Sequence, residues 1–264
     1  MRRFSANLSM LFQEYDFLDR FEKAREAGFT GVEYLFPYQW QPEQLASLLA
    51  RYGLTQVLHN LPAGDWAAGE RGIACIPGRE AEFRAGVDVA ITYAQKIGCS
   101  MLNCLVGKRP AGIHDEDLRQ ALVANLSYAA PLLEDAGIKL LIEPLNSRDI
   151  PGFFLVHTED ALAIRKLVNH PNLYLQYDVY HMQVMEGNLI QTITNNLESI
   201  AHIQIADNPG RHEPGTGEIN YANIFRALNE SGYSGWIGCE YLPLTTTKEG
   251  LRWMNSSQTK GESL

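Results

Sequence analysis

One pattern returns five times along this chain of 264 residues: a helix-like segment, a glycine, and then a short run rich in β-forming residues. The segments EKAREAG, LLARYG, YAQKIG, LLEDAG and ALNESG precede the runs GVEYLF, TQVLHN, MLNCLV, KLLIEP and WIGCEY. Their glycines are Gly28, Gly53, Gly98, Gly137 and Gly232. Each stands where a helix needs a left-handed residue before the chain turns into a strand. The pattern predicts a chain built from repeated αβ units.

Three more β-rich runs, FSANLS, NLYLQYD and IAHIQIAD, bring the predicted strands to eight. Eight strands that alternate with helices over roughly 250 residues are typical of a (β/α)8 TIM barrel. A doubly wound sheet is the main alternative, but it normally carries a glycine-rich turn after its first strand, and FSANLSMLF has no glycine. We therefore predict a single-domain α/β barrel over residues 1–254 and a polar, flexible tail at 255–264.

Composition narrows the partners of the chain. Its formal charge is −9, with 31 acidic residues against 22 Lys and Arg, which disfavours nucleic acid because phosphate binding needs a basic surface. No apolar window is long enough to cross a membrane. The four cysteines are scattered, and three lie in or near apolar runs, which predicts reduced core residues and a cytoplasmic protein. A small polar substrate is the expected partner, and self-association into a homo-oligomer is left open.

Four of the predicted strands end in a residue that can bind a metal: Glu143, Asp178, Gln204 and Glu240. In a barrel the carboxyl ends of all strands open onto one face, so these side chains are expected to meet across its mouth. A buried carboxylate is costly to desolvate alone, and the convergence of several indicates a shared cation. Because the set is rich in oxygen, it favours Mg²⁺ or Mn²⁺ over a structural zinc.

Other polar residues near the strand ends have two interpretations each. Glu33 is either functional or else a helix cap or half of an ion pair, and Gln204 alone would be a satisfied core amide. His59 is either a further ligand or substrate contact, or a hydrogen-bonded structural histidine. His181 follows Asp178 by three residues, close enough to bond either that acid or a substrate.

Two glutamates on different strands point to proton transfer. Glu143 and Glu240 can each take or give a proton on opposite sides of a chelated carbonyl compound. A metal would polarise the carbonyl and stabilise an enediolate. The sequence therefore predicts an enzyme that moves a proton between neighbouring carbons.

The segment 60–78 is long for a barrel loop and rich in Gly, Ala and Pro, which predicts a lid over the catalytic face. Glu70 and Arg71 lie within it and are candidate substrate contacts. Either Arg71 or Arg211 can clamp a substrate carboxylate with a planar fork of donors. For Arg71 the alternative is an ion pair that anchors the loop to a neighbouring acid.

Long segments of the chain resemble the hydroxypyruvate isomerase family, within the wider group of xylose isomerase-like barrels. They are HNLPAGDWAAGERGIACIPGRE at 59–80, LIEPLN at 141–146, YDVYHMQ at 177–183, HIQIADNPGRHEPGTGEINY at 202–221 and GCEY at 238–241. The resemblance implies interconversion of hydroxypyruvate and 2-hydroxy-3-oxopropanoate, with Glu143 and Glu240 at the proton donor and acceptor positions. It also implies metal ligation by Glu143, Asp178, Gln204 and Glu240, carried over from the wider group.

Relatives of similar fold supply the alternatives. Ketose 3-epimerases and apurinic endonucleases usually have histidine where this chain has Gln204, and the endonucleases add more histidines around a zinc cluster, whereas this chain has seven in total. A 2-oxo-tetronate isomerase, which acts on four carbons, differs mainly in the loop after the third strand. From another class, a non-catalytic sugar-acid binding protein would have no use for two proton-transfer glutamates, so the sequence favours an enzyme.

Overall fold

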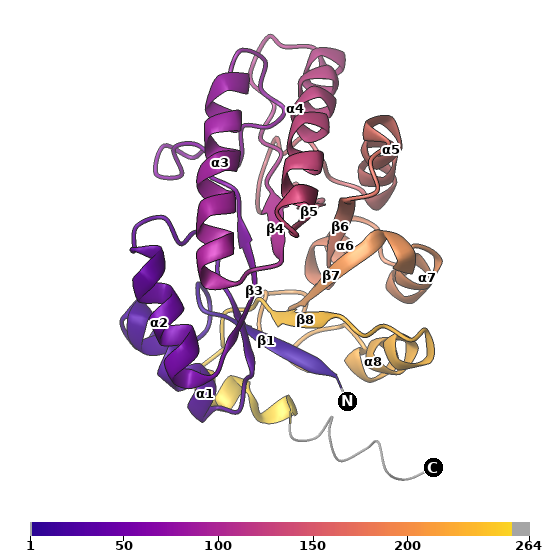
Figure 1. Cartoon of the computed structure of the whole chain (residues 1–264). Coiled ribbons are helices and arrows are strands. Elements are labelled where there is room, and N and C mark those ends of the chain that lie inside the picture. The colour runs from indigo at the N-terminus through magenta and orange to yellow at the C-terminus, as the bar shows by residue number, and fades with distance from the viewer. Residues whose placement is uncertain (1, 255–264) are drawn as a thin grey trace.

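The computed structural model describes residues 2–254 and is a closed barrel of eight parallel strands surrounded by helices (Figure 1). Each strand pairs with its neighbours in sequence, and β8 returns to β1. The strands are β1 (Arg3–Asn7), β2 (Gly31–Glu33), β3 (Thr55–Asn60), β4 (Met101–Cys104), β5 (Lys139–Ile142), β6 (Leu173–Asp178), β7 (Ile200–Ile205) and β8 (Trp236–Cys239). All eight predicted runs form these strands, which confirms the predicted fold. The predicted tail at 255–264 lies outside the described residues.

The helices occupy the segments between the strands. They are α1 (Arg20–Glu26), α2 (Pro42–Tyr52), α3 (Glu80–Ile97), α4 (Asp115–Asp135), α5 (Thr158–Val168), α6 (Val179–Met185), α7 (Leu189–Asn195), α8 (Tyr221–Glu230) and α9 (Thr247–Gly250). The five glycines of the repeated pattern all have left-handed backbones, with φ between 62° and 91°. Since side chains with a Cβ rarely adopt this region, glycine is what lets each helix turn directly into the next strand.

The barrel has two apolar layers. Outward-facing strand residues such as Leu175 and Ile203 pack with the helices in one large core. A smaller cluster fills the interior below the mouth: Leu58, Met101 and Leu141, with Tyr174 and Trp236 packed against it, and with Val57 beside it where the register of β3 shifts. Because successive strand residues face opposite sides, the interior can change from apolar to polar along one strand. Polar side chains therefore gather at the carboxyl ends.

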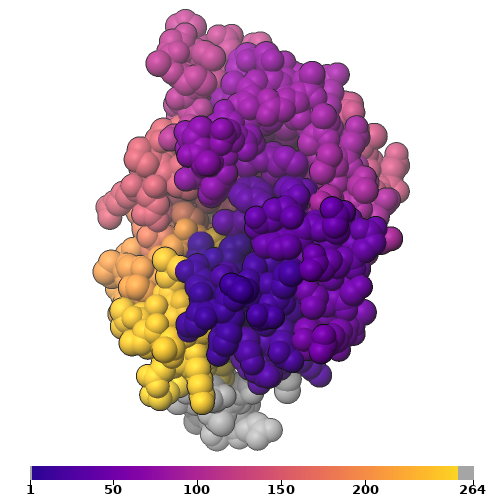
Figure 2. Space-filling model, turned by 90° about the vertical axis from the view of Figure 1, so that its left-hand side faces the viewer, coloured from indigo at the N-terminus to yellow at the C-terminus, as the bar shows by residue number. Residues whose placement is uncertain are grey.

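The first and last described parts of the chain lie side by side, as the indigo and yellow surfaces of Figure 2 show. Thr247 accepts a hydrogen bond from the Phe12 backbone at 2.7 Å, and Glu14 accepts from the Thr247 backbone at 2.6 Å and from its hydroxyl at 3.0 Å. These contacts reinforce, outside the barrel, the closure that β8 and β1 make within it.

Two further expectations concern the cysteines and the membrane. All four cysteines are buried free thiols, as predicted for reduced core residues. Among residues 2–254, every helix is too short or too polar to span a bilayer.

Candidate active site

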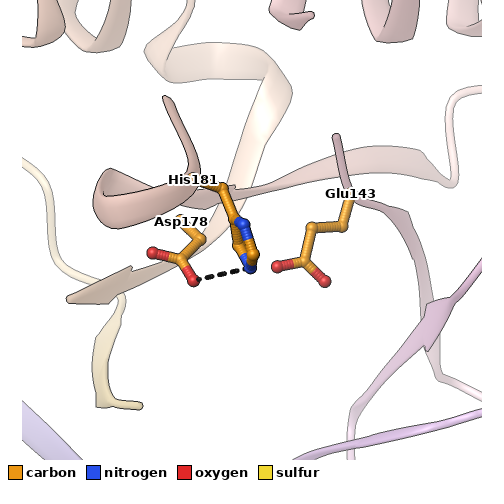
Figure 3. A group of neighbouring side chains, drawn as sticks. All are labelled: Glu143, Asp178 and His181. Atoms are coloured by element: carbon orange, nitrogen blue, oxygen red, sulfur yellow. Dashed lines mark ion pairs between the residues drawn. The ribbon is translucent and has the colours of Figure 1, made fainter. Parts of the chain in front are cut away.

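Three buried carboxylates meet at the mouth of the barrel. Asp178 ends β6, while Glu143 and Glu240 directly follow β5 and β8. Figure 3 shows Glu143 and Asp178 on opposite sides of the His181 ring, which belongs to α6. The possible metal-ligand atoms of Glu143, Asp178 and His181 lie within 4.8 Å of one another. Asp178 also caps α6, since its Oδ1 accepts from the Tyr180 backbone at 2.8 Å, and this fixes the turn from strand to helix.

Each glutamate is held by amide donors from the first half of the barrel. Asn103 Nδ2 donates to Glu143 Oε2 at 2.8 Å, and Asn7 Nδ2 donates to Glu240 Oε2 at 2.9 Å. The Gln204 amide nitrogen also donates to Glu240 Oε2. The carboxylates are therefore fixed by neutral groups that add no charge to the cluster.

Arg211 supplies the positive charge of the cluster. Its Nη2 lies 2.6 Å from Glu240 Oε1 and 3.5 Å from Asp178 Oδ2, and the guanidinium lies 5.3 Å from the centre of the Tyr180 ring. The Arg211 backbone is left-handed, with φ of 56°. It brings the side chain of a loop residue into contact with two buried acids.

A buried carboxylate holds the loop that carries Arg211. Asp207 accepts hydrogen bonds from the backbone N–H groups of Asn208, Gly215 and Ile219 at 3.0, 2.8 and 3.0 Å. Three charge-assisted bonds within one loop restrict its backbone, so the Arg211 position follows from Asp207 as well as from the acids that it meets.

The pKa values of all three carboxyl groups at this site are raised. Burial raises the pKa of Glu143 well above its usual value, and the charges of Glu240 and Asp178 add to the effect. Burial also raises the pKa of Glu240 to about 8, against the opposing charge of Arg211. The pKa of Asp178 is likewise raised by burial. Three acids facing one arginine therefore either hold a proton near neutral pH or bind a cation.

His181 is oriented as a hydrogen-bond donor. The Asn146 backbone N–H donates to its Nδ1 at 3.1 Å, so the neutral ring carries its hydrogen on Nε2. That nitrogen lies 3.6 Å from Asp178 Oδ2. Burial lowers the pKa of His181 well below its usual value, which keeps the ring neutral. A protonated Nε2 has no lone pair for a cation, so this tautomer suits a donor better than a metal ligand.

Gln204 reaches the cluster with its nitrogen. The Gln204 Oε1 accepts from Gln176 at 2.6 Å, and its Nε2 donates to Glu33 at 2.8 Å as well as to Glu240. Glu33 is half of a buried ion pair, with His202 Nε2 at 2.9 Å. Burial raises the pKa of Glu33, but the charge of His202 and the hydrogen bonds from His202, Ser5 and Gln204 together lower it by more, and the net shift is downward. This contact is the one that the ion-pair interpretation of Glu33 describes, and it is compatible with a functional role.

The structure does not bring His59 into the mouth. Its neighbour Asn60 faces inward, accepting from Asn103 at 3.2 Å, so His59 faces outward beside Leu102, with which it is in register. The ring lies 6.0 Å from that of Tyr38. Burial lowers the pKa of His59 to about 3. Neither ring nitrogen has a hydrogen-bond partner among the described residues.

The polar residues of the loop after β3 bond within the loop. Glu70 pairs with Arg79 and accepts from the Asp65 backbone at 2.5 Å. Arg71 lies 3.8 Å from the centre of the Trp66 ring and donates to the carbonyls of Trp66 and Glu70 at 3.2 and 2.6 Å. The anchoring ion pair considered for Arg71 is thus made by Arg79, and neither Glu70 nor Arg71 is bonded to the carboxylate cluster here.

Sequence reasoning missed the amides that hold the acids, among them Asn7, Asn103 and Gln176. A signal was available, because three buried strands carry polar residues two positions apart. These pairs are Ser5 with Asn7, Gln176 with Asp178, and His202 with Gln204. Residues two apart share one face of a strand, so each pair predicts a polar inner surface.

Comparison with known proteins settles the family. The family described as "Xylose isomerase-like TIM barrel" matches this chain over residues 21–257. The chain belongs to this family. It is 60% identical to "Hydroxypyruvate isomerase" of Escherichia coli K12, covering 97% of this chain and 99% of that protein. It is 46% identical to "2-oxo-tetronate isomerase" of Cupriavidus necator, covering 96% and 98%. These relatives confirm the predicted family and the predicted class of enzyme, an isomerase.

A solved structure gives the same architecture. The crystal structure titled "AP endonuclease, family 2" from Brucella melitensis superposes with a TM-score of 0.95 and 47% identity, covering 97% of this chain and 99% of that one. The barrel described above, including its long loops, is therefore shared over nearly the whole length of both chains.

The donor set fits a divalent cation through its carboxylates. Asp178 Oδ2 is buried and has no hydrogen-bond partner among the described residues, which leaves an oxygen aimed into the cluster. Glu143 and Glu240 lie beside it, and Arg211 offsets only part of their charge. Oxygen donors with excess negative charge are what a hard cation needs. The Gln204 oxygen, in contrast, is bonded to Gln176.

Proposed function

We propose that this protein is a hydroxypyruvate isomerase, which interconverts hydroxypyruvate and 2-hydroxy-3-oxopropanoate by proton transfer through an enediolate. The observation that carries the proposal is the pair of buried glutamates, Glu143 and Glu240, each with a raised pKa and each held by an asparagine. The Escherichia coli relative of that name, at 60% identity, supports the substrate.

The reaction balances within one substrate molecule. One glutamate takes the proton when a C–H bond at C3 of hydroxypyruvate breaks, and the electron pair forms an enediolate over C2 and C3. The other glutamate delivers a proton to C2, while the proton on the C3 oxygen moves to the C2 oxygen. The C3 alcohol is oxidised to an aldehyde as the C2 ketone is reduced to an alcohol. For this transfer one glutamate has to start ionised, as the base, and the other protonated, as the acid.

Two further residues are proposed to bind the substrate. His181 presents Nε2–H to the cluster and can donate to a substrate oxygen. Arg211 retains a buried Nε–H without a hydrogen-bond partner among the described residues, so it can still receive a carboxylate. A planar guanidinium fork suits a carboxylate better than a lysine does.

We propose that the cofactor is Mg²⁺ or Mn²⁺, held by the carboxylates of Glu143, Asp178 and Glu240. When bound, the cation would polarise the substrate carbonyl and stabilise the negative charge of the enediolate. The predicted fourth ligand, Gln204, is the subject of the next subsection.

The loop at 60–78 is proposed to act as a lid that excludes water from the enediolate. Within it Glu70, bonded to Arg79, and Arg71, stacked on Trp66, shape the lid, and their contact with substrate stays a prediction. A contact of His59 with substrate would require its ring to leave the outer face of β3. A cytoplasmic location is supported by the four buried thiols, and self-association stays a prediction.

A four-carbon substrate is the second candidate, because the Cupriavidus necator relative, at 46% identity, is named for it. The same two glutamates would carry out the same two proton transfers, and only the room beyond C3 would differ. The net charge of −9 argues against a nucleic acid substrate.

The test measures kcat/KM for hydroxypyruvate, for a 2-oxo-tetronate and for dihydroxyacetone, with added Mn²⁺ and with chelator, in H₂O and D₂O. We expect hydroxypyruvate to be the best substrate, with solvent deuterium entering the product carbon, and the matched variant Glu143→Gln to be inactive. Preference for the tetronate would establish the second candidate. Absence of turnover with every substrate would refute an isomerase, and turnover without deuterium in the product would refute the transfer of protons between two glutamates.

A further inference from the structure

Glu33 is a fully buried carboxylate beneath the catalytic cluster, and it is surrounded by donors. Its Oε2 accepts from Ser5 at 2.7 Å and from His202 at 2.9 Å, and its Oε1 accepts from Gln204 at 2.8 Å and, more weakly, from Asn7 at 3.4 Å. None of these contacts requires Glu33 to donate. A carboxylate that only accepts, from four side chains on two other strands, is held as a fixed anion.

A glycine on β8, the strand on the other side of β1, leaves room for this anion. Gly238 of β8 faces Glu33, and a Cβ at position 238 would lie 2.3 Å from Glu33 Oε1. Since real Cβ atoms do not approach an oxygen so closely, any other residue at 238 would displace Glu33. The four hydrogen-bond donors therefore hold the Glu33 carboxylate, and the lack of a side chain at Gly238 gives it the space that it occupies.

Two amide groups bridge Glu33 to Glu240. The Nδ2 of Asn7 and the Nε2 of Gln204 each donate to Glu33 Oε1 and also to Glu240 Oε2. A primary amide has two N–H donors, so each group can serve both carboxylates at once.

The orientation of both amides is fixed at the other end. Asn7 Oδ1 accepts from the Ser9 backbone N–H at 3.0 Å, and that donor cannot be exchanged. Gln204 Oε1 accepts from Gln176 at 2.6 Å. Turning Gln204 over would place its oxygen against Glu33 Oε1, an acceptor, and would replace an attraction with a repulsion.

We infer that Glu33 is a positioning residue for Glu240: it holds Asn7 and Gln204 as donors to Oε2 and leaves Oε1, beside Arg211, to transfer the proton. The same contacts keep the Gln204 oxygen away from the cluster, so Gln204 is a hydrogen-bond donor to Glu240 and not a metal ligand. The role of Glu240 rests on the proposed function.

The kinetic test is a double-mutant cycle of Glu33→Gln and Gln204→Met, with Gln56→Met as the matched control. Gln56 is a buried strand amide like Gln204, but its Nε2 donates to the Leu58 carbonyl at 2.8 Å, and no hydrogen bond joins it to Glu33 or Glu240 among the described residues. We expect Glu33→Gln to lower kcat by about 10- to 100-fold with little change in KM, as for an interaction made in the transition state. Gln204→Met should cost a similar factor, and the double variant no more than either single one, because coupled residues are not additive. Gln56→Met should stay within about threefold of the wild-type kcat.

The structural test needs no turnover. Crystals of the wild type soaked in Mn²⁺ should place the Gln204 oxygen beyond the range of about 2.0 to 2.6 Å for a hard-cation ligand, with Gln204 still bonded to Glu33. Additive losses in the cycle, or Gln204 oxygen bound to the metal, would overturn the inference. Wild-type protein that turns over no hydroxy-oxo acid would instead overturn the proposed function, while the soaked crystal would still decide the role of Gln204.

Discussion

The two halves of the barrel end their strands in different chemistry. In the second half, acids stand at the ends of β5, β6 and β8, whereas in the first half, amides stand at the ends of β1, β3 and near the end of β4: Asn7, Asn60 and Asn103. The amides of one half bond the acids of the other, Asn103 to Glu143 at 2.8 Å and Asn7 to Glu240 at 2.9 Å. One half supplies groups that can exchange protons, and the other holds them without adding charge.

Glu33 and Glu143 are both buried glutamates, but their surroundings shift their pKa values in opposite directions. Glu33 is an acid in the amide half, and although burial raises its pKa, His202 and the hydrogen bonds from Ser5 and Gln204 together leave the pKa below the usual value. Glu143 is equally buried, but its neighbours Glu240 and Asp178 are acids, and its pKa is well above the usual value. Burial alone therefore does not make a proton-transfer group, and the sign of the neighbouring charge decides it.

The largest effect is expected in the acid half. Glu143→Gln and Glu240→Gln should each lower kcat by about 100-fold or more, because the amide keeps the shape but cannot act as acid or base. Steady-state kinetics on variants with unchanged circular dichroism is the measurement. Near-normal turnover in either variant would remove that glutamate from the mechanism.

Arg211 tests whether the acids share their site with a substrate carboxylate. Arg211→Lys should lower kcat/KM for hydroxypyruvate by about 10- to 100-fold, since a point charge cannot make two parallel hydrogen bonds to a carboxylate. Dihydroxyacetone, which has no carboxylate, should be a poor substrate of the wild type and should lose less in the variant. Equal use of both compounds by the wild type would exclude a carboxylate clamp and favour a ketose epimerase.

A smaller effect is expected in the amide half. Asn103→Ala removes the hydrogen bond to Glu143 and should lower kcat about tenfold, the factor that corresponds to a charged hydrogen bond of about 1.5 kcal/mol. Asn60→Ala is the control, because Asn60 bonds Asn103 and no hydrogen bond joins it to a carboxylate among the described residues. If the two variants lose the same activity, the amides act as packing and not as holders of the acids.

The smallest effect concerns stability and pH. Burial raises the pKa of Glu240 to about 8, so the folded state holds its proton more tightly than the unfolded state does. The linked stability is complete below the unfolded pKa, about 4.3, and is lost as pH rises through the folded value. Chelated protein should therefore melt at a lower temperature at pH 9 than at pH 5.

Mn²⁺ should reverse this loss, because a cation replaces the proton as the partner of the acids. We expect the rise in melting temperature on adding Mn²⁺, measured by scanning calorimetry, to be larger at pH 8.5 than at pH 6. Glu240→Gln, which has no charge to compensate, is the matched control. An equal rise at both pH values would show that the metal binds away from these carboxylates.

Much of this architecture was predictable from local sequence. The glycines after the helices and the β-rich runs marked all eight strands, and the acids at their ends marked Glu143, Asp178 and Glu240. The contacts that hold them were not predictable in this way. Asn7 and Glu240 are separated by 233 residues, and nothing local to either one indicates the other.

The sequence by itself determined the barrel, because backbone preference, glycine at left-handed positions and apolar periodicity act over a few residues. It also determined which strand ends carry acids. Only the tertiary structure decided which way each polar group faces. The His59 side chain faces outward because the Asn60 side chain beside it faces inward. Gln204 points its nitrogen at the cluster because Glu33, 171 residues earlier in the sequence, accepts a hydrogen bond from it. Such choices depend on partners that only folding brings together, at distances where a donor and an acceptor cannot be exchanged without cost.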